Sequence, residues 1–535
     1  MIVARLMAGV VVAVAPVPLP KARPTLVVVI TVDQLRPDYL AQWRPQLTDG
    51  FARLLRSGAV FDSAFQDHAI SETAVGHAVL LAGRHPSSTG IVMNELGVQD
   101  STAPLVAGIG TGASPVRFRG TVLMDWLKAA SPQARGLSVS RKDRAAILPM
   151  GRTREEVYWD GRGVMTTSTH YARDLPPWVR AFNARRIPQH AAGSAWELLL
   201  PARAYAEPDS QPWENGGEDV VFPHAWRADS TTGVAAFLRS PAVDAYTLAF
   251  ALEGVNTLGL GRGPAIDLLA ISLSATDYIG HAYGPGSREM HDQIVRLDRA
   301  LGAFLDSLFR LRDSSAVVIA LTADHGVTPP LEYSRAVNGL DVGGLELNTF
   351  GRAMDSALTQ RFGPAAGPPG PWASSEKGLV LIRRRALTAR GVNVDSLVAL
   401  WRAAAGWSPW VARIDTRATL AAADTARDAV ARRWRHLLPP DWEAELMITL
   451  RPGCLWLPYW TTSPWSARVV ADHGQPSDDD THVPLVLWGT GVRAGRISGR
   501  VGIVDLAPTL ARLAGVRPLE PLDGRVLAEA LATRE

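Results

Sequence analysis

Six aspartate and histidine residues could bind metal ions. Two pairs among them are spaced so that both members of the pair can bind the same ion. Asp277 and His281 are four residues apart, so that both can point at one ion, and Asp324 is followed directly by His325. The sequence has one cysteine, which excludes a zinc site built on cysteine pairs and leaves His, Asp and Glu as ligands. Three Asp and three His suffice for two zinc sites that keep open positions for water and substrate. The six candidates are Asp33, Asp277, His281, Asp324, His325 and His482.

Phosphoryl transfer is the chemistry that two such ions favour. Two metals about 4 Å apart can hold the attacking and the leaving oxygen of an in-line displacement. Each pair of residues alone is weak support, because an Asp that follows a strand more often forms a turn or caps a helix. The prediction gains its strength from six such residues at the ends of apolar runs.

A hydroxyl group that could act as a nucleophile lies in the stretch SETAVGH, residues 71–77. We expect a helix over Ala74–Ala82, which puts Thr73 at the helix N-terminus. Backbone N–H groups and the helix dipole favour an anion at that position. An ordinary Thr cap is the competing interpretation of this residue, and Ser71 is the rival nucleophile.

Strands that alternate with helices would position these groups. Continuous apolar runs predict strands buried on both faces, as in a parallel sheet, and amphipathic stretches between them predict helices. We therefore predict an α/β fold, with a central, mostly parallel sheet and helices on both faces. Three of the candidate Asp residues lie just beyond such runs, where the ligands of open α/β sheets collect. The predicted strands are Thr25–Val32, Leu268–Leu273, Ala316–Leu321 and Val483–Trp488, and the predicted helices are Asp49–Ser57, Ala74–Ala82, Ser287–Phe309 and Val504–Ala514.

Two stretches interrupt this core pattern. Residues 150–240 are rich in Trp, Pro and Arg and show weak periodicity, which predicts an irregular insertion. Residues 328–475 hold a separate order of strands and helices, which predicts a small α+β insertion. Its predicted strands are Gly378–Ile382, Trp410–Ile414 and Ala444–Leu450, and its predicted helices are Val394–Ala405 and Asp424–Leu437.

The composition narrows the class of protein. Hydrophobic residues make up 47% and charged residues 20% of the 535 residues, which excludes a disordered chain. A net charge of +3 gives no basic surface for nucleic acid. Residues 1–20 hold one early charge and an apolar run that is short for a membrane span. We predict a signal peptide there and a periplasmic or secreted protein without a stable membrane anchor, with an uncleaved anchor as the alternative.

Sequence blocks along most of the chain resemble the alkaline phosphatase superfamily, in its threonine-nucleophile branch of monomeric bacterial phosphatases. The order and context of the blocks are far more specific than any one motif. The resemblance implies that residues 21–535 form an alkaline-phosphatase-like catalytic domain that acts as a monomer. The blocks are VVVITVDQLRPDYL, SETAVGHAVLLAGRHPSSTGIVMNE, SRKDRAAILP, TSTHYARDLPPWV, ISLSATDYIGHAYGP, LTADHGV, DDDTHVPLVLWG and IVDLAPTLARLAGV.

The resemblance also implies how two Zn2+ per chain are bound. Asp33, Asp324 and His325 would bind one zinc, which Thr73 also contacts. The other zinc would be bound by Asp277, His281 and His482. His473, in the ADHG stretch, is the rival for the place of His482. Ligand type alone leaves manganese and iron open.

Three further residues match groups that bind phosphate in this family. Asn94 lies 21 residues after Thr73 and matches an asparagine that donates to a phosphate oxygen. Lys142 and Arg144 match the lysine and arginine of the monoesterase-like branch. Because a monoester has two charges on its free oxygens and a diester one, a Lys and an Arg here favour small-molecule phosphate monoesters as substrates. The competing interpretation is a solvated charge cluster.

The activity implied is hydrolysis of phosphate monoesters through a phosphothreonine intermediate, with no nucleic acid as a dedicated partner. A phosphodiesterase or nucleotide pyrophosphatase of the same superfamily is the first alternative, although that branch normally lacks the Lys and Arg. A sulfatase is disfavoured, because its nucleophile motif is absent. A metal- or phosphate-binding protein without turnover is the alternative from another class. We expect residues 150–240 and 328–475 to form the pocket beyond the phosphate.

Overall fold

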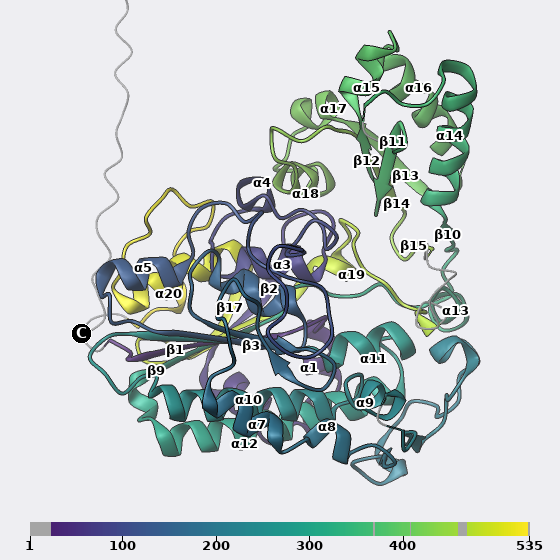
Figure 1. The fold of residues 1–535 in the computed structure, drawn as a ribbon. Coiled ribbons are helices and arrows are strands. Elements are labelled where there is room, and N and C mark those ends of the chain that lie inside the picture. Colours follow the sequence, from purple (N-terminus) through teal and green to yellow (C-terminus); the bar gives the residue numbers. More distant parts are fainter. Residues whose placement is uncertain (1–22, 230, 368–369, 407, 458–467, 533–535) are drawn as a thin grey trace, which may run out of the picture.

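The computed structural model describes residues 23–229, 231–367, 370–406, 408–457 and 468–532. The signal peptide predicted for residues 1–20 lies outside the described residues. The described chain forms a large sheet covered by helices, with a smaller α+β unit beside it (Figure 1). Within these ranges, no helix combines the length and the apolar character that crossing a membrane requires.

The central sheet has nine strands in the order β17-β2-β16-β9-β1-β8-β3-β4-β5. Strand β1 pairs in parallel with β8 on one side and with β9 on the other, so that three predicted strands form the middle of the sheet. The mostly parallel sheet predicted from the sequence is thus confirmed, with β16 as an antiparallel strand between β9 and β2. The bounds are β1 Leu26–Val32, β2 Ala59–Phe65, β3 Gly136–Ser140, β4 Glu156–Asp160, β5 Met165–Thr166, β8 Asp267–Leu273, β9 Val317–Thr322, β16 His482–Gly489 and β17 Gly495–Gly502.

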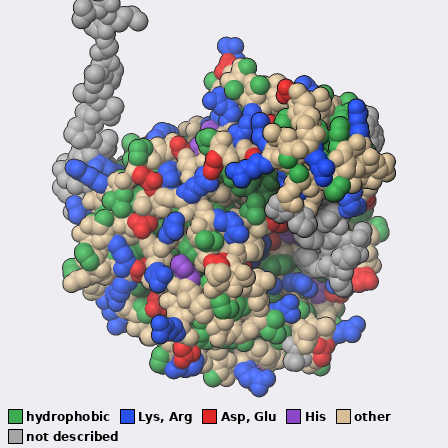
Figure 2. Space-filling model, turned by 45° about the horizontal axis from the view of Figure 1, so that its top comes forward, with side chains coloured by type: hydrophobic (Ala, Val, Ile, Leu, Met, Phe, Trp, Pro, Cys, Tyr) green, Lys and Arg blue, Asp and Glu red, His purple; other side chains and the backbone are tan. Residues whose placement is uncertain are grey.

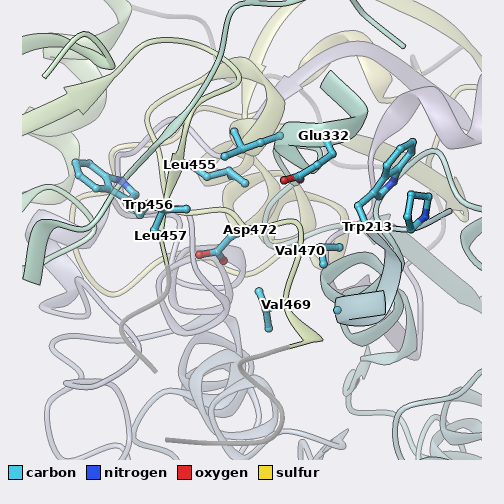
Figure 3. Close-up of a pocket in the computed structure, with 11 residues that line it drawn as sticks. Trp213, Glu332, Leu455, Trp456, Leu457, Val469, Val470 and Asp472 are labelled. Atoms are coloured by element: carbon cyan, nitrogen blue, oxygen red, sulfur yellow. The ribbon is translucent and has the colours of Figure 1, made fainter. Parts of the chain in front are cut away.

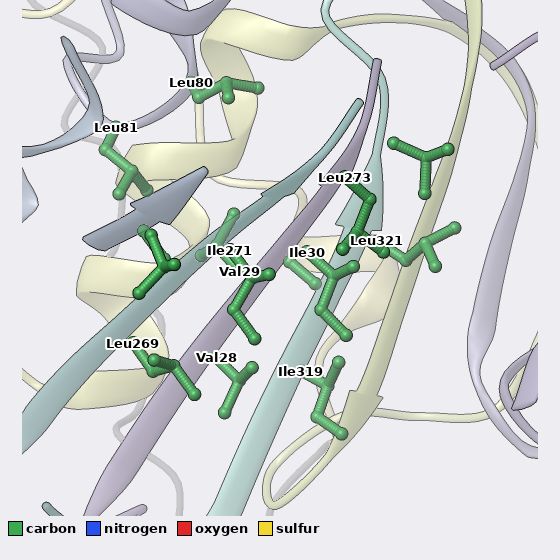
Figure 4. Close-up of a cluster of buried hydrophobic side chains, with 14 of the residues drawn as sticks. Val28, Val29, Ile30, Leu80, Leu81, Leu269, Ile271, Leu273, Ile319 and Leu321 are labelled. Carbon is green, nitrogen blue, oxygen red and sulfur yellow. The ribbon is translucent and has the colours of Figure 1, made fainter. Parts of the chain in front are cut away.

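The middle strands are buried along their whole length, as their continuous apolar sequences predict. In Figure 4 the side chains of Val28, Ile30, Ile271 and Ile319 lie packed together across three neighbouring strands. Complete burial of one such side chain stabilises the fold by roughly 1.5–3 kcal/mol, so this core holds the strand ends firmly in register.

Helices cover both faces of the sheet (Figure 1). On one face lie α10 and α12, and α2 packs against α12. On the other face lie α3, α5 and α20, so the predicted layering is confirmed. The bounds are α2 Gly50–Ser57, α3 Thr73–Leu80, α5 Leu123–Ala130, α10 Ala242–Leu258, α12 Arg288–Leu311 and α20 Leu506–Ala514.

The stretch 328–475 contains an antiparallel sheet of order β11-β12-β14-β13 with helices packed against it. It has its own core, in which Trp372 and Trp401 are fully buried. The predicted strands and helices of this insertion are present, and β11 is an additional strand. Its main elements are α14 Leu347–Phe362, β11 Ala373–Glu376, β12 Leu379–Ile382, α16 Val394–Ala405, β13 Val411–Thr416, α18 Ala429–Leu437 and β14 Ala444–Leu450.

The insertion packs on the core beside the start of α3. Val75 and Met93 from the core share one buried cluster with Leu379, Trp434 and Met447 from the insertion. Helix α18 also contacts α4 (Pro86–Thr89) of the core. The two units therefore meet next to the proposed nucleophile.

The stretch 150–240 starts with a core element that its sequence does not reveal. Strand β4 pairs in parallel with β3, and β5 pairs with β4, so the boundary at residue 150 is too early by two strands of the central sheet. The rest is made of short elements, which fits its weak periodicity. They include α7 Pro177–Ala184, α8 Ile187–His190, β6 Ala195–Trp196, β7 His224–Ala225 and α9 Thr232–Phe237.

Candidate active site at the carboxyl edge of the sheet

Three buried carboxylates meet where the middle strands of the sheet end. Asp33 follows β1 directly, Asp324 follows β9 by two residues, and Asp277 lies on α11 (Ala275–Tyr283) after β8. Their exposed fractions are 0%, 0% and 3%. Because β1, β8 and β9 are neighbouring parallel strands, their carboxyl ends bring these side chains together.

Histidines complete two groups that could each hold a metal ion. Ligand atoms of Asp33, Asp277 and His325 lie within 4.8 Å of one another, and so do those of Asp277, His281 and His473. His325 Nε2 is 3.4 Å from Asp33 Oδ1 and 3.6 Å from Asp324 Oδ2. His281 Nε2 is 3.3 Å from Asp277 Oδ1. Five of the six candidate ligands are therefore together.

His482 does not join them, and His473 has the place that the sequence analysis assigned to His482. The ring of His473 stacks on that of His325 with centroids 3.6 Å apart, and its Nε2 is 3.7 Å from Asp277 Oδ1. His482 instead stacks on Phe65 at 4.7 Å and lines a separate cavity of about 450 Å³ with Arg36. Because β16 runs antiparallel to β9, His482 also lies at the carboxyl edge of β9, but it pairs with Phe65 of β2 and its ring stacks on that side chain.

The proton positions of three histidines can be assigned from their hydrogen bonds. Each Nδ1 faces a backbone carbonyl oxygen, which can only accept, so Nδ1 carries a proton, and in the neutral form of the ring the free lone pair is on Nε2. Those Nε2 atoms point at the carboxylates. An Nδ1–H donated to a carbonyl is how metal-binding histidines are usually held. The pairs are His281 with Ala471 O at 2.8 Å, His325 with Gly326 O at 2.9 Å and His473 with Ser71 O at 2.7 Å.

The donor set fits a divalent cation. Asp33 Oδ1 and His325 Nε2 are buried and make no hydrogen bond within the described part of the chain. Burial, with the negative charges of Asp277 and Asp324, raises the pKa of Asp33 well above its usual range. Burial and nearby positive groups lower the pKa of His473 well below its usual range, which keeps the ring in the neutral form that binds metals.

Thr73 is the first residue of α3 and is almost fully buried. Its Oγ1 accepts a hydrogen bond of 3.2 Å from Lys142 Nζ. The same ammonium group lies 2.5 Å from Asp33 Oδ2 and 2.7 Å from Asp277 Oδ2. Burial acts to lower the pKa of Lys142, but these two carboxylates outweigh burial and raise it, so the side chain is charged. The hydroxyl group thus lies beside both candidate metal groups.

The rival nucleophile is directed elsewhere, because Ser71 Oγ donates to Gln475 O at 3.2 Å.

Gly76 lets α3 approach the sheet closely, since a Cβ atom there would be 2.2 Å from Asp324 O. His77 is fully buried, and its Nδ1 donates to Thr73 O at 2.8 Å. The spacing of four residues from Thr73 on one helix is the signal that could have revealed it.

Asn94 and Arg144 differ in how firmly they are placed. Asn94 Oδ1 accepts from the N–H of Ala74 at 2.9 Å, and its own N–H donates to Glu72 Oε2 at 2.8 Å. These bonds fix the amide against the start of α3. Arg144 is partly exposed, its Nη1 is 3.7 Å from Asp143 Oδ1, and its Nε has no hydrogen-bond partner among the described residues.

Gln34 is a site residue that the sequence did not point to. It follows Asp33 in the left-handed region at φ 66°. Its side-chain amide donates to Asp277 Oδ1 at 3.0 Å, and its N–H donates to Asp324 Oδ1 at 3.1 Å. Adjacency to a candidate ligand was the available signal, and the structure shows that Gln34 fixes two of the carboxylates.

A cavity of about 400 Å³ lies beside this cluster (Figure 3). Trp213 from the 150–240 stretch and Trp456 from the insertion line it, together with Asp472, whose carboxylate is 3.9 Å from His281 Nδ1. Figure 2 shows Lys and Arg side chains bordering the hollow between the insertion and the core. Both stretches expected to form a pocket therefore contribute to one.

The fold and the site together define a member of the alkaline phosphatase superfamily. The chain belongs to the type I phosphodiesterase / nucleotide pyrophosphatase family, whose sequence model matches residues 27–346. The match covers most of β1 and five candidate ligands, Asp33, Asp277, His281, Asp324 and His325, whereas His473 and His482 lie beyond its end.

Full-length relatives are similar along nearly the whole chain. Alkaline phosphatase PhoK of Sphingomonas sp is 31% identical over 94% of this chain and 91% of its own length. Alkaline phosphatase PafA of Elizabethkingia meningoseptica is 27% identical over 95% of both. A crystal structure of wild-type alkaline phosphatase PafA superimposes with a TM-score of 0.85 at 26% identity, over 96% of this chain and 99% of that one.

Proposed function

We propose that this protein is an alkaline phosphatase that hydrolyses phosphate monoesters with two bound zinc ions and a phosphothreonine intermediate. The observation that carries the proposal is the set of three histidines whose Nδ1 atoms donate to backbone carbonyls, with their Nε2 lone pairs aimed at buried carboxylates beside Thr73. The whole-chain similarity to proteins named alkaline phosphatases supports it.

Two sets of residues would hold the ions. Asp33, Asp324 and His325 form one set next to Thr73, and Asp277, His281 and His473 form the other. Carboxylate and imidazole ligands suit zinc. Ions bound there would favour deprotonation of the threonine hydroxyl and stabilise negative charge on the leaving oxygen.

The chain's own groups perform the steps as follows. Thr73 loses its proton to water and its Oγ1 attacks phosphorus, while the bond from phosphorus to the ester oxygen breaks and that oxygen takes up a proton from water and departs as the alcohol. Phosphothreonine results, and water then attacks phosphorus, so that inorganic phosphate and the threonine hydroxyl are released. The N-terminal end of α3 stabilises negative charge at the attacking group throughout.

Three side chains would hold the free phosphate oxygens, on which transition-state charge develops. The Nδ2 group of Asn94 is available to donate, because Ala74 and Glu72 engage other atoms of that residue. The ammonium of Lys142 is 3.2 Å from the hydroxyl oxygen of Thr73. The Nε of Arg144 has no hydrogen-bond partner among the described residues, and a guanidinium can bind two oxygens at once. A phosphate monoester with two negative charges can pair with both Lys142 and Arg144.

The family name makes a diesterase the second candidate. Its substrate has a second organic group on phosphorus and one charge fewer, so it gains less from Lys142 and Arg144. The test compares wild type with the double variant Lys142→Ala/Arg144→Ala on an aryl phosphate monoester and an aryl phosphate diester, with zinc supplied. A strong monoester preference that the double variant loses supports the proposal. A diester preference that the double variant leaves unchanged would transfer the assignment to diesterase.

The cavity beside Asp472 would receive the alcohol portion of the ester. Its aromatic and apolar lining, which includes Trp213 and Trp456, favours aryl and apolar alcohols over charged ones. We expect Trp456→Ala to raise KM for an aryl phosphate more than for a small alkyl phosphate. Equal changes for both substrates would exclude this role of the cavity.

A further inference from the structure

The turn between β11 and β12 of the insertion carries a lysine in an unfavourable backbone conformation. Glu376 pairs with Leu379, so Lys377 and Gly378 form the two-residue turn, with φ of 44° and 87°. Turns of this kind favour Asn-Gly, because the left-handed region strains other side chains. Strain at such a position is usually retained for a functional reason. The side chain of Lys377 supplies one.

Lys377 reaches from the insertion into the edge of the candidate active site. Its Nζ donates to Asp472 Oδ2 at 2.7 Å and to His473 O at 2.7 Å, and it lies 4.0 Å from Glu72 Oε1. The side chain is 15% exposed, so these contacts are largely shielded from solvent. Lys377 therefore contacts the backbone of one candidate metal ligand and the residue that precedes the proposed nucleophile.

The loop that receives the lysine is shaped for it. Gly474 follows His473 with φ of 110°, and a Cβ atom there would be 2.7 Å from Cδ of Lys377. The aliphatic part of the lysine thus passes over a position that has no side chain. Any larger residue at 474 would displace it.

The groups that Lys377 contacts fix other parts of the site. The backbone N–H of Thr328 donates to Asp472 O at 2.9 Å, which ties the two ends of the insertion together. Glu72 Oε2 accepts a hydrogen bond of 2.8 Å from the backbone N–H of Asn94. One ammonium group therefore connects the loop of His473 with the segment that holds Thr73 and Asn94.

The same ammonium offsets a concentration of negative charge. Carboxylate oxygens of Glu72, Glu95 and Glu376 lie within 4.8 Å of one another, and Asp472 is on the other side of Lys377. Without the lysine, Glu72 and Asp472 would repel each other across the gap. The loop of His473 would then move away from the start of α3.

We propose that Lys377 is a positioning residue for metal binding: the insertion uses it to hold His473 against Asp277 and His281, and so sets the affinity of that site for zinc. The inference relies on the proposed function for the existence of a metal site, and it concerns a residue that never touches substrate.

The test measures zinc affinity directly, by competition with a chromophoric chelator, in full-length wild type and in Lys377→Asn. Asparagine suits the left-handed turn, so the variant should keep its thermal midpoint without metal while its contacts with Asp472 and His473 are lost. We expect one zinc to bind about 10–100-fold more weakly, as for other residues that orient ligands. Excess zinc should restore most of kcat, and Lys377→Arg, which keeps a charged donor, should lose less affinity.

The matched control is Lys128→Asn, which removes another paired lysine. Lys128 lies on α5, and its Nζ is 2.9 Å from Glu155 Oε1. It should bind zinc like wild type. Unchanged zinc affinity in Lys377→Asn, or a lower thermal midpoint with affinity lost equally in both sites, would overturn the proposal. A wild type that binds zinc but lacks phosphatase activity would refute the proposed function alone, since the affinity comparison would still decide the role of Lys377.

Discussion

The two sets of residues that would hold the ions are built in different ways. Asp33 and Asp324 lie at the ends of neighbouring parallel strands, whose register is fixed by backbone hydrogen bonds and complete burial. His473 lies on the loop that ends the insertion, where its Nδ1 donates to Ser71 O and its backbone carbonyl accepts from Lys377 Nζ. The first group is positioned by the sheet itself, and the second depends on contacts between distant segments.

This difference shows which part of the site is robust. A strand end cannot shift without breaking several ladder hydrogen bonds, whereas the loop of His473 can shift when single contacts are lost. We therefore expect substitutions to separate the two groups, with losses of metal affinity concentrated in the group of Asp277, His281 and His473.

The largest effect is expected at the hydroxyl that faces both groups. Thr73→Ala should lower kcat for an aryl phosphate by at least about 10³-fold, because the nucleophile is lost. Zinc content, measured by atomic absorption, should remain that of wild type. Ser71→Ala is the control and should keep most of the activity, since Ser71 Oγ is directed to Gln475 O. Equal losses in both variants would contradict Thr73 as nucleophile.

The two histidines before and at the start of β16 provide the sharpest comparison. His473→Ala should weaken the binding of one zinc ion by more than about 100-fold, since a direct ligand matters more than a residue that orients one. His482→Ala should bind zinc like wild type, because its ring stacks on Phe65. Isothermal titration of both metal-free variants distinguishes them, and the reverse order would restore His482 as the ligand.

A smaller effect is expected where α3 touches the sheet. Gly76→Ala places a Cβ atom 2.2 Å from Asp324 O, so the helix must move outward. We expect a loss of about 1–3 kcal/mol in the free energy of unfolding, measured in urea, with lower activity at saturating zinc. Wild-type stability and activity would show that the strand-borne group tolerates displacement of the helix.

The smallest effect is expected in a part of the insertion away from the site. Asn393 caps α16, and its Oδ1 accepts from the N–H of Asp395 at 2.7 Å. Asn393→Ala should lower the stability of the insertion by about 1 kcal/mol. Zinc affinity and kcat should remain those of wild type when they are measured in the same experiments as those of Lys377→Asn. A change in either would mean that the whole insertion, and not one turn, controls the metal site.

The sequence allowed the strand-borne part of the site to be predicted, because apolar runs mark buried strands and polar residues mark their ends. Asp33, Asp277 and Asp324 are together for that reason. His473 and His482 are nine residues apart in the sequence, and the contacts of their rings distinguish them: His473 stacks on His325, whereas His482 stacks on Phe65.

Contacts between distant segments account for the rest of what was missed. The sequence around Lys377 predicts only a turn, and its role depends on how the insertion packs on the core. Strand β4 is short and lies in a Trp- and Pro-rich stretch, so its sequence does not mark it as a strand of the central sheet. The role of Lys377 and the place of β4 in the sheet both depend on tertiary packing, which the local sequence pattern does not show.

The side-by-side ends of the insertion have an evolutionary consequence. Thr328 and Asp472 form an isolated antiparallel bridge, so the chain leaves the core and returns to it at one point. A unit attached in this way can be exchanged for a longer, shorter or unrelated cassette without a change in the sheet. Both junctions lie close to candidate metal ligands, His325 on one side and His473 on the other. Such an exchange would therefore change the surroundings of both candidate metal sites at once.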